Sequence, residues 1–173
     1  MFEQMSNQLL FDVLALLPEI MLLVTICAVI PADMLAPLSQ SRNISLRFGC
    51  LGLLFALLAV GQHPFVGDGS PYPFYYFGGS FVVDRLASLF KLLFVGGALV
   101  TLLLTWRSET LAGLRFGEYV VLILGAVLGA CVLASANNYV VLLLGLETLS
   151  LCSYVLAGYL KDRRESAEAS LKY

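Results

Sequence analysis

Charged residues are scarce in this chain of 173 residues, in which Asp, Glu, Lys and Arg make up only 13% of the positions. Soluble domains carry roughly 25% charged residues, so the composition argues against a soluble domain with an ordinary charged surface. The net charge of -2 is spread over short polar patches without a continuous basic face, and we expect no nucleic-acid partner. Hydrophobic residues make up 60% of the chain and its mean hydropathy is +0.89. These values indicate a lipid bilayer as the natural surroundings of the chain.

Sequence signatures of soluble catalysis are also absent. The chain has no phosphate-binding G-x-G-x-x-G or G-K-[ST] loop, no H-E-x-x-H motif and no nucleophile elbow. Cysteines at a metal or redox spacing are missing, so no haem or iron–sulfur ligand set is recognisable. We expect no cofactor and no metal in this chain, and we interpret its cysteines as small apolar fillers: Cys27, Cys50, Cys131 and Cys152.

Five long apolar stretches occupy most of residues 1–160. A helix needs roughly 20 mostly apolar residues to cross a bilayer, and the second stretch reaches an adequate length when it is extended to Ile44–Gln62. The N-terminal residues carry no Lys or Arg and precede no small-residue cleavage site, so we expect no cleaved signal peptide. The sequence predicts an all-α, polytopic transmembrane helix bundle with spans at Leu14–Leu35, Phe48–Val60, Phe81–Trp106, Tyr119–Ala136 and Tyr139–Leu160.

The basic residues predict the orientation of this bundle, because Lys and Arg in short loops stay on the cytoplasmic side. They lie between the first and second spans, between the third and fourth, and after the fifth: Arg42, Arg47, Arg107, Arg115, Lys161, Arg163, Arg164 and Lys172. The N-terminus and the other two loops have none. We therefore expect the N-terminus outside and residues 161–173 in the cytoplasm. That last segment is predicted to be a basic loop followed by the start of a sixth helix, capped by Ser166.

The segment 61–80 has a composition of its own, with three prolines, five glycines and six aromatic residues. Such a segment cannot form a helix, and its aromatic rings suit the headgroup region of a membrane. We expect it to fold over the outer surface as a lid or a short hairpin. His63, the single histidine, lies in this segment without a second ligand nearby, and we assign it no role.

Glu147 is the strongest candidate for a functional ionisable residue. It lies within about one helical turn of the middle of the fifth predicted span, where a charge costs roughly 2.5–3.5 kcal/mol on insertion scales. Ser150 and Tyr154 share its helical face, so we expect this polar stripe to face a bundle interior or a hydrated path rather than lipid. Two roles remain open for the carboxyl group: a proton path, or a structural, hydrogen-bonded glutamic acid.

Lys91 is a second candidate, some two turns inside the third span and on one helical face with Asp84 and Ser88. Its side chain either belongs to a charged path or extends to the outer interface to reach water. Asp84 and Arg85 lie near the outer mouth, where adjacent charges are more easily solvated.

Two acidic residues of the first span have local explanations. Glu19 follows Pro18 at the start of the span, where the first turn of a helix tolerates proline and favours an acid. A capping role therefore competes with a role in transport. Asp33 is expected, together with Pro31, to break the other end of the span at the membrane interface.

Small residues in the fourth span predict close helix packing. Gly125 and Gly129 have G-x-x-x-G spacing. Such spacing lets another backbone approach closely. The pattern indicates a bundle but no particular function.

The last part of the chain carries a recognisable pattern of motifs. Residues 145–147 read G-L-E and are followed by a serine-rich turn, a basic loop and E-A-S-L-K-Y at residues 168–173. This stretch resembles subunit N of the proton-translocating NADH:quinone oxidoreductase, respiratory complex I. Shorter matches follow in the order of the same family: L-L-P-E-I at residues 16–20, F-V-V-D-R-L-A-S at 81–88 and G-E-Y at 117–119.

The resemblance implies both a fold and a function. The family has fourteen helices with two inverted five-helix repeats and is related to cation/proton antiporter subunits, so this chain would cover about a third of it. Glu147 would be the glutamate that pairs with a lysine on a later helix, and quinone reduction elsewhere in the complex would perturb that pair to move a proton. Lys91 and Lys172 become possible members of a charged path.

The resemblance also implies a location and partners. The protein would cross the cell inner membrane with its N-terminus on the periplasmic side, among other antiporter-like and small helical subunits of complex I. NADH, quinone, FMN and iron–sulfur clusters would belong to the wider complex rather than to this chain. Two alternatives remain: a subunit of a multisubunit sodium/proton antiporter that works without NADH, and a structural membrane module in which Glu147 is a neutral hydrogen-bonding group.

Overall fold

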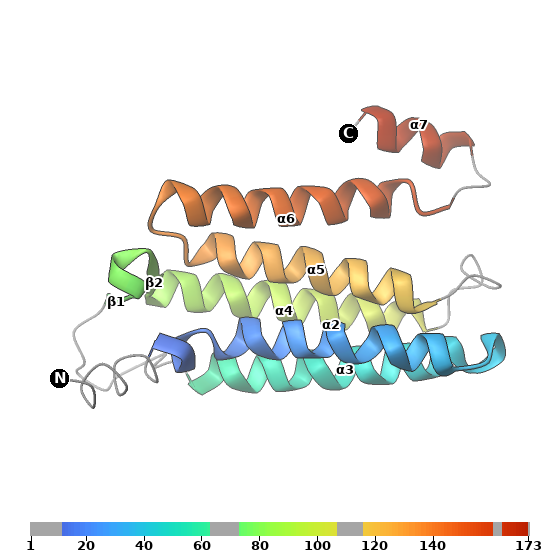
Figure 1. Cartoon of the computed structure of the whole chain (residues 1–173), viewed down its shortest axis with the longest axis horizontal. Helices are drawn as coiled ribbons and strands as arrows, with labels where there is room; N and C mark the ends of the chain where they lie inside the picture. Colours follow the sequence, from blue (N-terminus) through green and yellow to red (C-terminus); the bar gives the residue numbers. More distant parts are fainter. Residues whose placement is uncertain (1–11, 63–72, 107–115, 161–163, 173) are drawn as a thin grey trace.

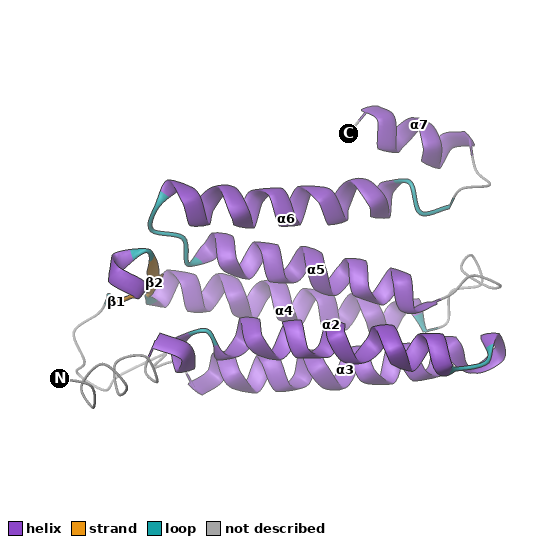
Figure 2. Ribbon diagram, in the orientation of Figure 1, coloured by secondary structure: helices purple, strands orange, loops and turns teal. Residues whose placement is uncertain are grey.

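Five long helices dominate the computed structural model, which describes residues 12–62, 73–106, 116–160 and 164–172. Successive helices run in opposite directions and lie side by side (Figure 1). Figure 2 shows that nearly all of the described chain is helical. All five are long and apolar enough to cross a membrane, which confirms the expected all-α bundle: α2 (Leu17–Leu35), α3 (Leu38–Gln62), α4 (Arg85–Thr105), α5 (Phe116–Ala134) and α6 (Tyr139–Ala157).

Helix α3 begins earlier than the sequence pattern predicts. It starts at Leu38, so Arg42 lies on the helix and not in a loop, as does Arg47, which the extended span Ile44–Gln62 already included. Arg42 is held there because its Nη2 donates to the carbonyl oxygen of Thr105, at 3.2 Å, and to that of Trp106. These bonds satisfy carbonyl groups at the end of α4, which a helix terminus otherwise leaves without partners.

The aromatic segment before α4 forms a β-hairpin, as expected, in the part that the structure describes. Strand β1 (Phe74–Tyr76) pairs antiparallel with strand β2 (Phe81–Val83). The reversal between them uses positive φ angles at Phe77 (51°), Gly78 (63°) and Gly79 (86°), and glycine adopts such angles readily. The third predicted span was wrong in its first residues, because Phe81–Val83 are a strand and the helix begins after Asp84.

The hairpin is tied to the connection between α5 and α6 at one end of the bundle. The amide of Val82 donates to the carbonyl of Ser135 at 2.9 Å, and the amide of Asn137 donates to the carbonyl of Ser80 at 3.1 Å. Phe81 also forms an isolated antiparallel bridge with Ala136. We call this end of the bundle, where α2, α4 and α6 begin, the hairpin end (Figure 1).

Helix α7 (Arg164–Lys172) marks the opposite end of the bundle, which we call the α7 end. The predicted helix is present, but the predicted cap is wrong, because the helix begins two residues before Ser166. The hydroxyl of Ser166 instead donates to the carbonyl of Ala157 at 2.7 Å. This bond fastens α7 to the last turn of α6.

The hydrophobic core lies between helices α2, α3, α4 and α5. Its fully buried side chains include Leu22, Leu46, Leu53, Leu102 and Leu124. Helix α6 lies outside this four-helix core, against α5, and Gly145 is the one buried residue among the described residues of α6. Most of the apolar surface of α6 is therefore uncovered by the described part of the chain.

Candidate functional site

Glu147 lies in the middle of α6, which confirms its predicted depth in an apolar helix. Its side chain is exposed, so the described part of the chain does not place it in a bundle interior. Thr148, the next residue, has its hydroxyl bonded to the carbonyl of Leu144 at 2.8 Å. The hydroxyl of Thr148 is thus satisfied within α6. The side chain of Glu147, in contrast, is directed away from the core.

Helical geometry explains the direction of Glu147. Gly145 faces α5, since a Cβ atom built on it would lie 3.1 Å from the carbonyl oxygen of Gly129. Glu147 follows Gly145 by two residues, which rotates it by about 200° around the helix axis. Glu147 therefore lies on the face of α6 opposite α5, where Tyr154 and Ser150 also lie.

A second ionisable site joins two helices of the core. The Nζ atom of Lys91 on α4 lies 2.7 Å from Oε1 of Glu19 on α2, and the two side chains are 1% and 7% exposed. Burial of two charges costs several kcal/mol per ion unless they compensate each other, so the pairing explains why both can lie inside an apolar bundle. Lys91 does not extend to the interface for water, and that alternative is wrong.

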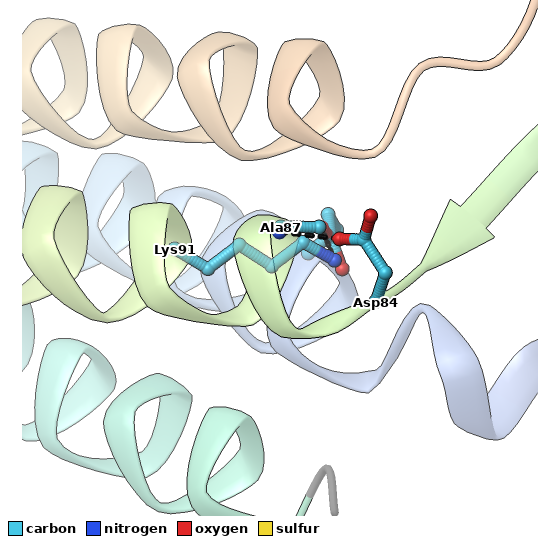
Figure 3. A network of polar contacts seen from close by, with 4 residues as sticks. Asp84, Ala87 and Lys91 are labelled. Atoms are coloured by element: carbon cyan, nitrogen blue, oxygen red, sulfur yellow. Dashed lines mark hydrogen bonds and ion pairs between the residues drawn. The ribbon is translucent and has the colours of Figure 1, made fainter. Parts of the chain in front are cut away.

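The side chain of Lys91 runs back toward the start of α4 (Figure 3), the direction that long side chains take on helices. Its Nζ lies 4.8 Å from the centre of the Phe81 ring, a cation–π distance. Asp84 is occupied otherwise, because its carboxylate caps α4 by accepting from the amide of Ala87 at 2.6 Å. Lys91 therefore has Glu19, and not Asp84, as its ionic partner.

The position of Glu19 corrects its local interpretation. It lies in the first turn of α2, but it does not cap that turn, because its carboxylate is directed to Lys91. Sequence reasoning weighed the two charges separately and missed the pair. A signal was available, since both charges lie near the same end of two predicted spans that run in the same direction.

Asp33 is the second buried carboxylate that sequence reasoning explained wrongly. It lies inside α2 and is only 4% exposed. Its Oδ1 accepts hydrogen bonds from the hydroxyl of Ser45 at 2.8 Å, from the amide of Gly117 at 3.2 Å and from the hydroxyl of Ser41. Asp33 thus joins α2 to α3 and to the start of α5, and it does not break the helix at the interface.

The surroundings of Asp33 extend to Tyr159, just beyond the end of α6. Burial, with the negative charges of Glu118 and Asp33, raises the pKa of Tyr159 to about 12. A pocket of about 480 Å³ lies beside Asp33 and is also lined by Ile30, Met34, Glu118 and Val121.

Among the described residues, no three His, Cys, Asp or Glu side chains gather as metal ligands would.

The structure does not bring the three predicted site residues together. Lys172 lies on α7, where its exposed side chain is 3.6 Å from Glu168, one turn earlier. Lys91 is buried near the hairpin end. Glu147 lies in the middle of the bundle, on the face of α6 opposite α5. The predictions for His63, Arg107, Arg115, Lys161 and Arg163 fall outside the described residues.

Known proteins with similar sequences are named as subunits of quinone oxidoreductases. A family model described as "NADH:quinone oxidoreductase/Mrp antiporter, TM" matches residues 136–173. NAD(P)H-quinone oxidoreductase subunit 2 of Synechococcus sp. (strain JA-3-3Ab) is 34% identical over 161 residues, which are 92% of this chain and 29% of the relative. NADH-quinone oxidoreductase subunit N 1 of Solibacter usitatus is 33% identical over 94% of this chain and 32% of its own length.

Subunit N 2 of Rhizobium meliloti is also 33% identical, over 92% of this chain and 32% of its own length. The chain thus spans about three tenths of the length of the curated relatives that it matches. The matched segment 136–173 includes α6 and Glu147.

Proposed function

Because this chain belongs to the antiporter-like membrane subunits of NADH:quinone oxidoreductase, we propose that it works in the proton-translocating membrane arm of such a complex. Its role there is to couple electron transfer from NADH to quinone to the movement of protons across the membrane. Other subunits of the complex bind NADH, FMN, the iron–sulfur clusters and the quinone. Its neighbours are further antiporter-like and small helical membrane subunits.

The position of Glu147 carries this proposal. An ionisable residue in the middle of an apolar helix is rarely kept without a function, and Glu147 lies on the face of α6 that the described core leaves open. In the complete subunit this face meets further helices, one of which supplies a basic partner for the carboxylate. A change in the charge of that partner moves a proton on to or off Glu147. Lys91 and Lys172 extend the charged path toward the two ends of the bundle.

The proposed location is the bacterial inner membrane, with the hairpin end on the outer side. The basic residues Arg42, Arg47, Arg164 and Lys172 support this orientation, because they lie at or near the α7 end of the described chain. Aromatic residues of the hairpin suit the outer headgroup region. A sodium/proton antiporter subunit is the second candidate, favoured by the mention of Mrp antiporters in the description of the matching family.

The carboxyl group of Glu147 can be tested by replacing it with Gln in the full-length subunit within its complex. Glu147→Gln keeps the shape of the side chain but removes the exchangeable proton. We expect proton translocation driven by NADH oxidation to fall by about tenfold or more, as expected when a proton-transfer group is lost. The measurement is dye-reported acidification in inverted membrane vesicles, alongside the rate of NADH oxidation.

Thr148→Val is the matched control, because its hydroxyl bonds within the helix. This variant should translocate protons at the wild-type rate. Wild-type rates of both NADH oxidation and proton translocation in Glu147→Gln would contradict the proposal. Native electrophoresis of the tagged protein with an NADH dehydrogenase stain distinguishes the candidates, since an antiporter subunit would migrate without NADH-oxidising activity.

A further inference from the structure

The Glu19–Lys91 pair is buried with most of its hydrogen-bonding capacity unmet. Apart from their mutual contact of 2.7 Å, the two carboxylate oxygens of Glu19 and the Nζ of Lys91 have no hydrogen-bond partner in the part of the chain that the structure describes. Buried charges that serve only to hold helices together normally have their remaining donors and acceptors satisfied. Polar groups buried in this way are commonly satisfied by water.

A third polar group lies close to this pair. Ser135 is fully buried at the end of α5, and its hydroxyl also has no partner among the described residues. The next residue, Ala136, is bridged to Phe81, whose ring covers the ammonium group of Lys91. Unmet polar groups from α2, α4 and the end of α5 therefore gather in one region near the hairpin end.

A pocket lies next to this region. A pocket of about 320 Å³ at the hairpin end is lined by Ala136, Asn137, Asn138, Tyr139 and Leu142. Its lining begins at the residue that follows Ser135. Ser135 thus directly precedes the lining of a pocket that accommodates several waters, since each water occupies about 30 Å³.

We propose that Glu19, Lys91 and Ser135 form a hydrated proton-binding site, separate from Glu147, that exchanges protons with the hairpin side of the membrane. This inference rests on the proposed function, because the site binds and releases protons only if protons move through the subunit. Its ligands are a proton and the waters that carry it. The three residues come from different helical ends, so packing of the bundle creates the site.

The exchange involves only proton transfer and needs no redox partner. In the paired state Glu19 is a carboxylate and Lys91 is an ammonium. An arriving proton forms an O–H bond on Glu19, which leaves the ammonium of Lys91 beside the Phe81 ring. Release breaks that O–H bond, and the proton passes through water at Ser135 to the pocket at residues 136–142. Glu19 and Lys91 then form their ion pair again.

The double variant Glu19→Gln/Lys91→Met separates this function from a structural role. Removing one charge would strand the other in the core, whereas replacing both charges by neutral side chains of similar size is often neutral for stability. We expect the complex containing this variant to assemble at the wild-type level on native gels. Proton translocation in inverted vesicles should nevertheless fall by at least about twofold relative to NADH oxidation.

Ser135→Ala tests the same site without touching a charge. Its hydroxyl has no partner among the described residues, so its removal should leave assembly unchanged while slowing proton translocation. If the double variant fails to assemble, the translocation rate of Ser135→Ala tests the proposed proton-binding site on its own. Wild-type translocation in Ser135→Ala, or in an assembled double variant, overturns the proposed site.

Parallel measurement of Glu147→Gln separates the two proposals. If Glu147→Gln impairs translocation but the Glu19, Lys91 and Ser135 variants do not, this site alone is refuted. If all of them translocate protons at the wild-type rate, the proposed function fails as well.

Discussion

Asp33 shows at the scale of single residues what a charged group needs inside an apolar bundle. Its carboxylate is satisfied by two hydroxyl groups of α3 and by the amide of Gly117 at the start of α5. The start of a helix carries unpaired N–H groups and a partial positive charge, so a carboxylate is stabilised there. Gly117 permits this approach, because a Cβ atom on it would lie 2.4 Å from the side chain of Asp33.

Asp33→Ala should destabilise the protein through these contacts. The change leaves the hydroxyls of Ser41 and Ser45 and the amide of Gly117 buried without their acceptor, and each unmet buried group costs about 1–3 kcal/mol. We expect a lower thermal unfolding midpoint for the purified full-length protein in detergent. Glu118→Ala is the control, since Glu118 lies at the same end but is exposed. Equal midpoints for the two variants would show that the junction does not contribute to stability.

The contact between α5 and α6 shows how helices are joined at the scale of whole elements. Gly125 and Gly129 face α6, which confirms the close approach predicted from their spacing. A Cβ atom on Gly129 would lie 2.6 Å from the backbone nitrogen of Leu149, and one on Gly125 would lie 2.7 Å from the Sγ of Cys152. Inside a membrane, helices gain no free energy from leaving water, so van der Waals contact between their backbones stabilises their association.

Gly129→Ala should therefore weaken the attachment of α6. Its new methyl group meets backbone atoms, which cannot rotate away, and overpacking of this kind costs about 1–3 kcal/mol. We expect the Gly129→Ala variant to unfold in detergent at a lower SDS fraction than the wild-type protein. Circular dichroism measures the loss of helix. Gly97→Ala is a matched change on α4, where nothing lies within 4 Å of the added Cβ, and it should leave the transition unchanged or raise it slightly. Identical curves for the two variants would argue against the glycine contact.

At the scale of the whole molecule, the bundle has two chemically distinct ends and one open side. The hairpin lies at the end at which α2, α4 and α6 begin. Of the six described Lys and Arg residues, Arg85 and Lys91 lie at or near this end, and the other four lie at or near the opposite end: Arg42, Arg47, Arg164 and Lys172. Helix α6 leaves most of its surface exposed, Glu147 included. The orientation decides from which side protons reach each ionisable site, so it should be measured directly.

Single cysteines in an otherwise cysteine-free full-length protein can report this orientation. Tyr75 in the hairpin is 60% exposed, and Glu118 is exposed near the α7 end. We expect a membrane-impermeant maleimide to label Tyr75→Cys in intact cells, because basic ends stay in the cytoplasm. Glu118→Cys should be labelled only after the cells are permeabilised. The reverse pattern would invert the proposed topology and the direction of both proton sites.

The amino-acid sequence by itself determined the five spanning helices of the described residues and the location of Glu147 in the last of them. Spanning segments must satisfy their backbone hydrogen bonds internally, so hydrophobic length alone predicts helices, and a lone charge in an apolar run is visible without a structure. Tertiary packing decided the partners of the buried charges. Glu19 and Lys91 belong to different helices, as do Asp33 and the hydroxyls that bind it, and no local pattern specifies which faces of two helices will meet. Their charges are tolerated only because packing brings these groups together.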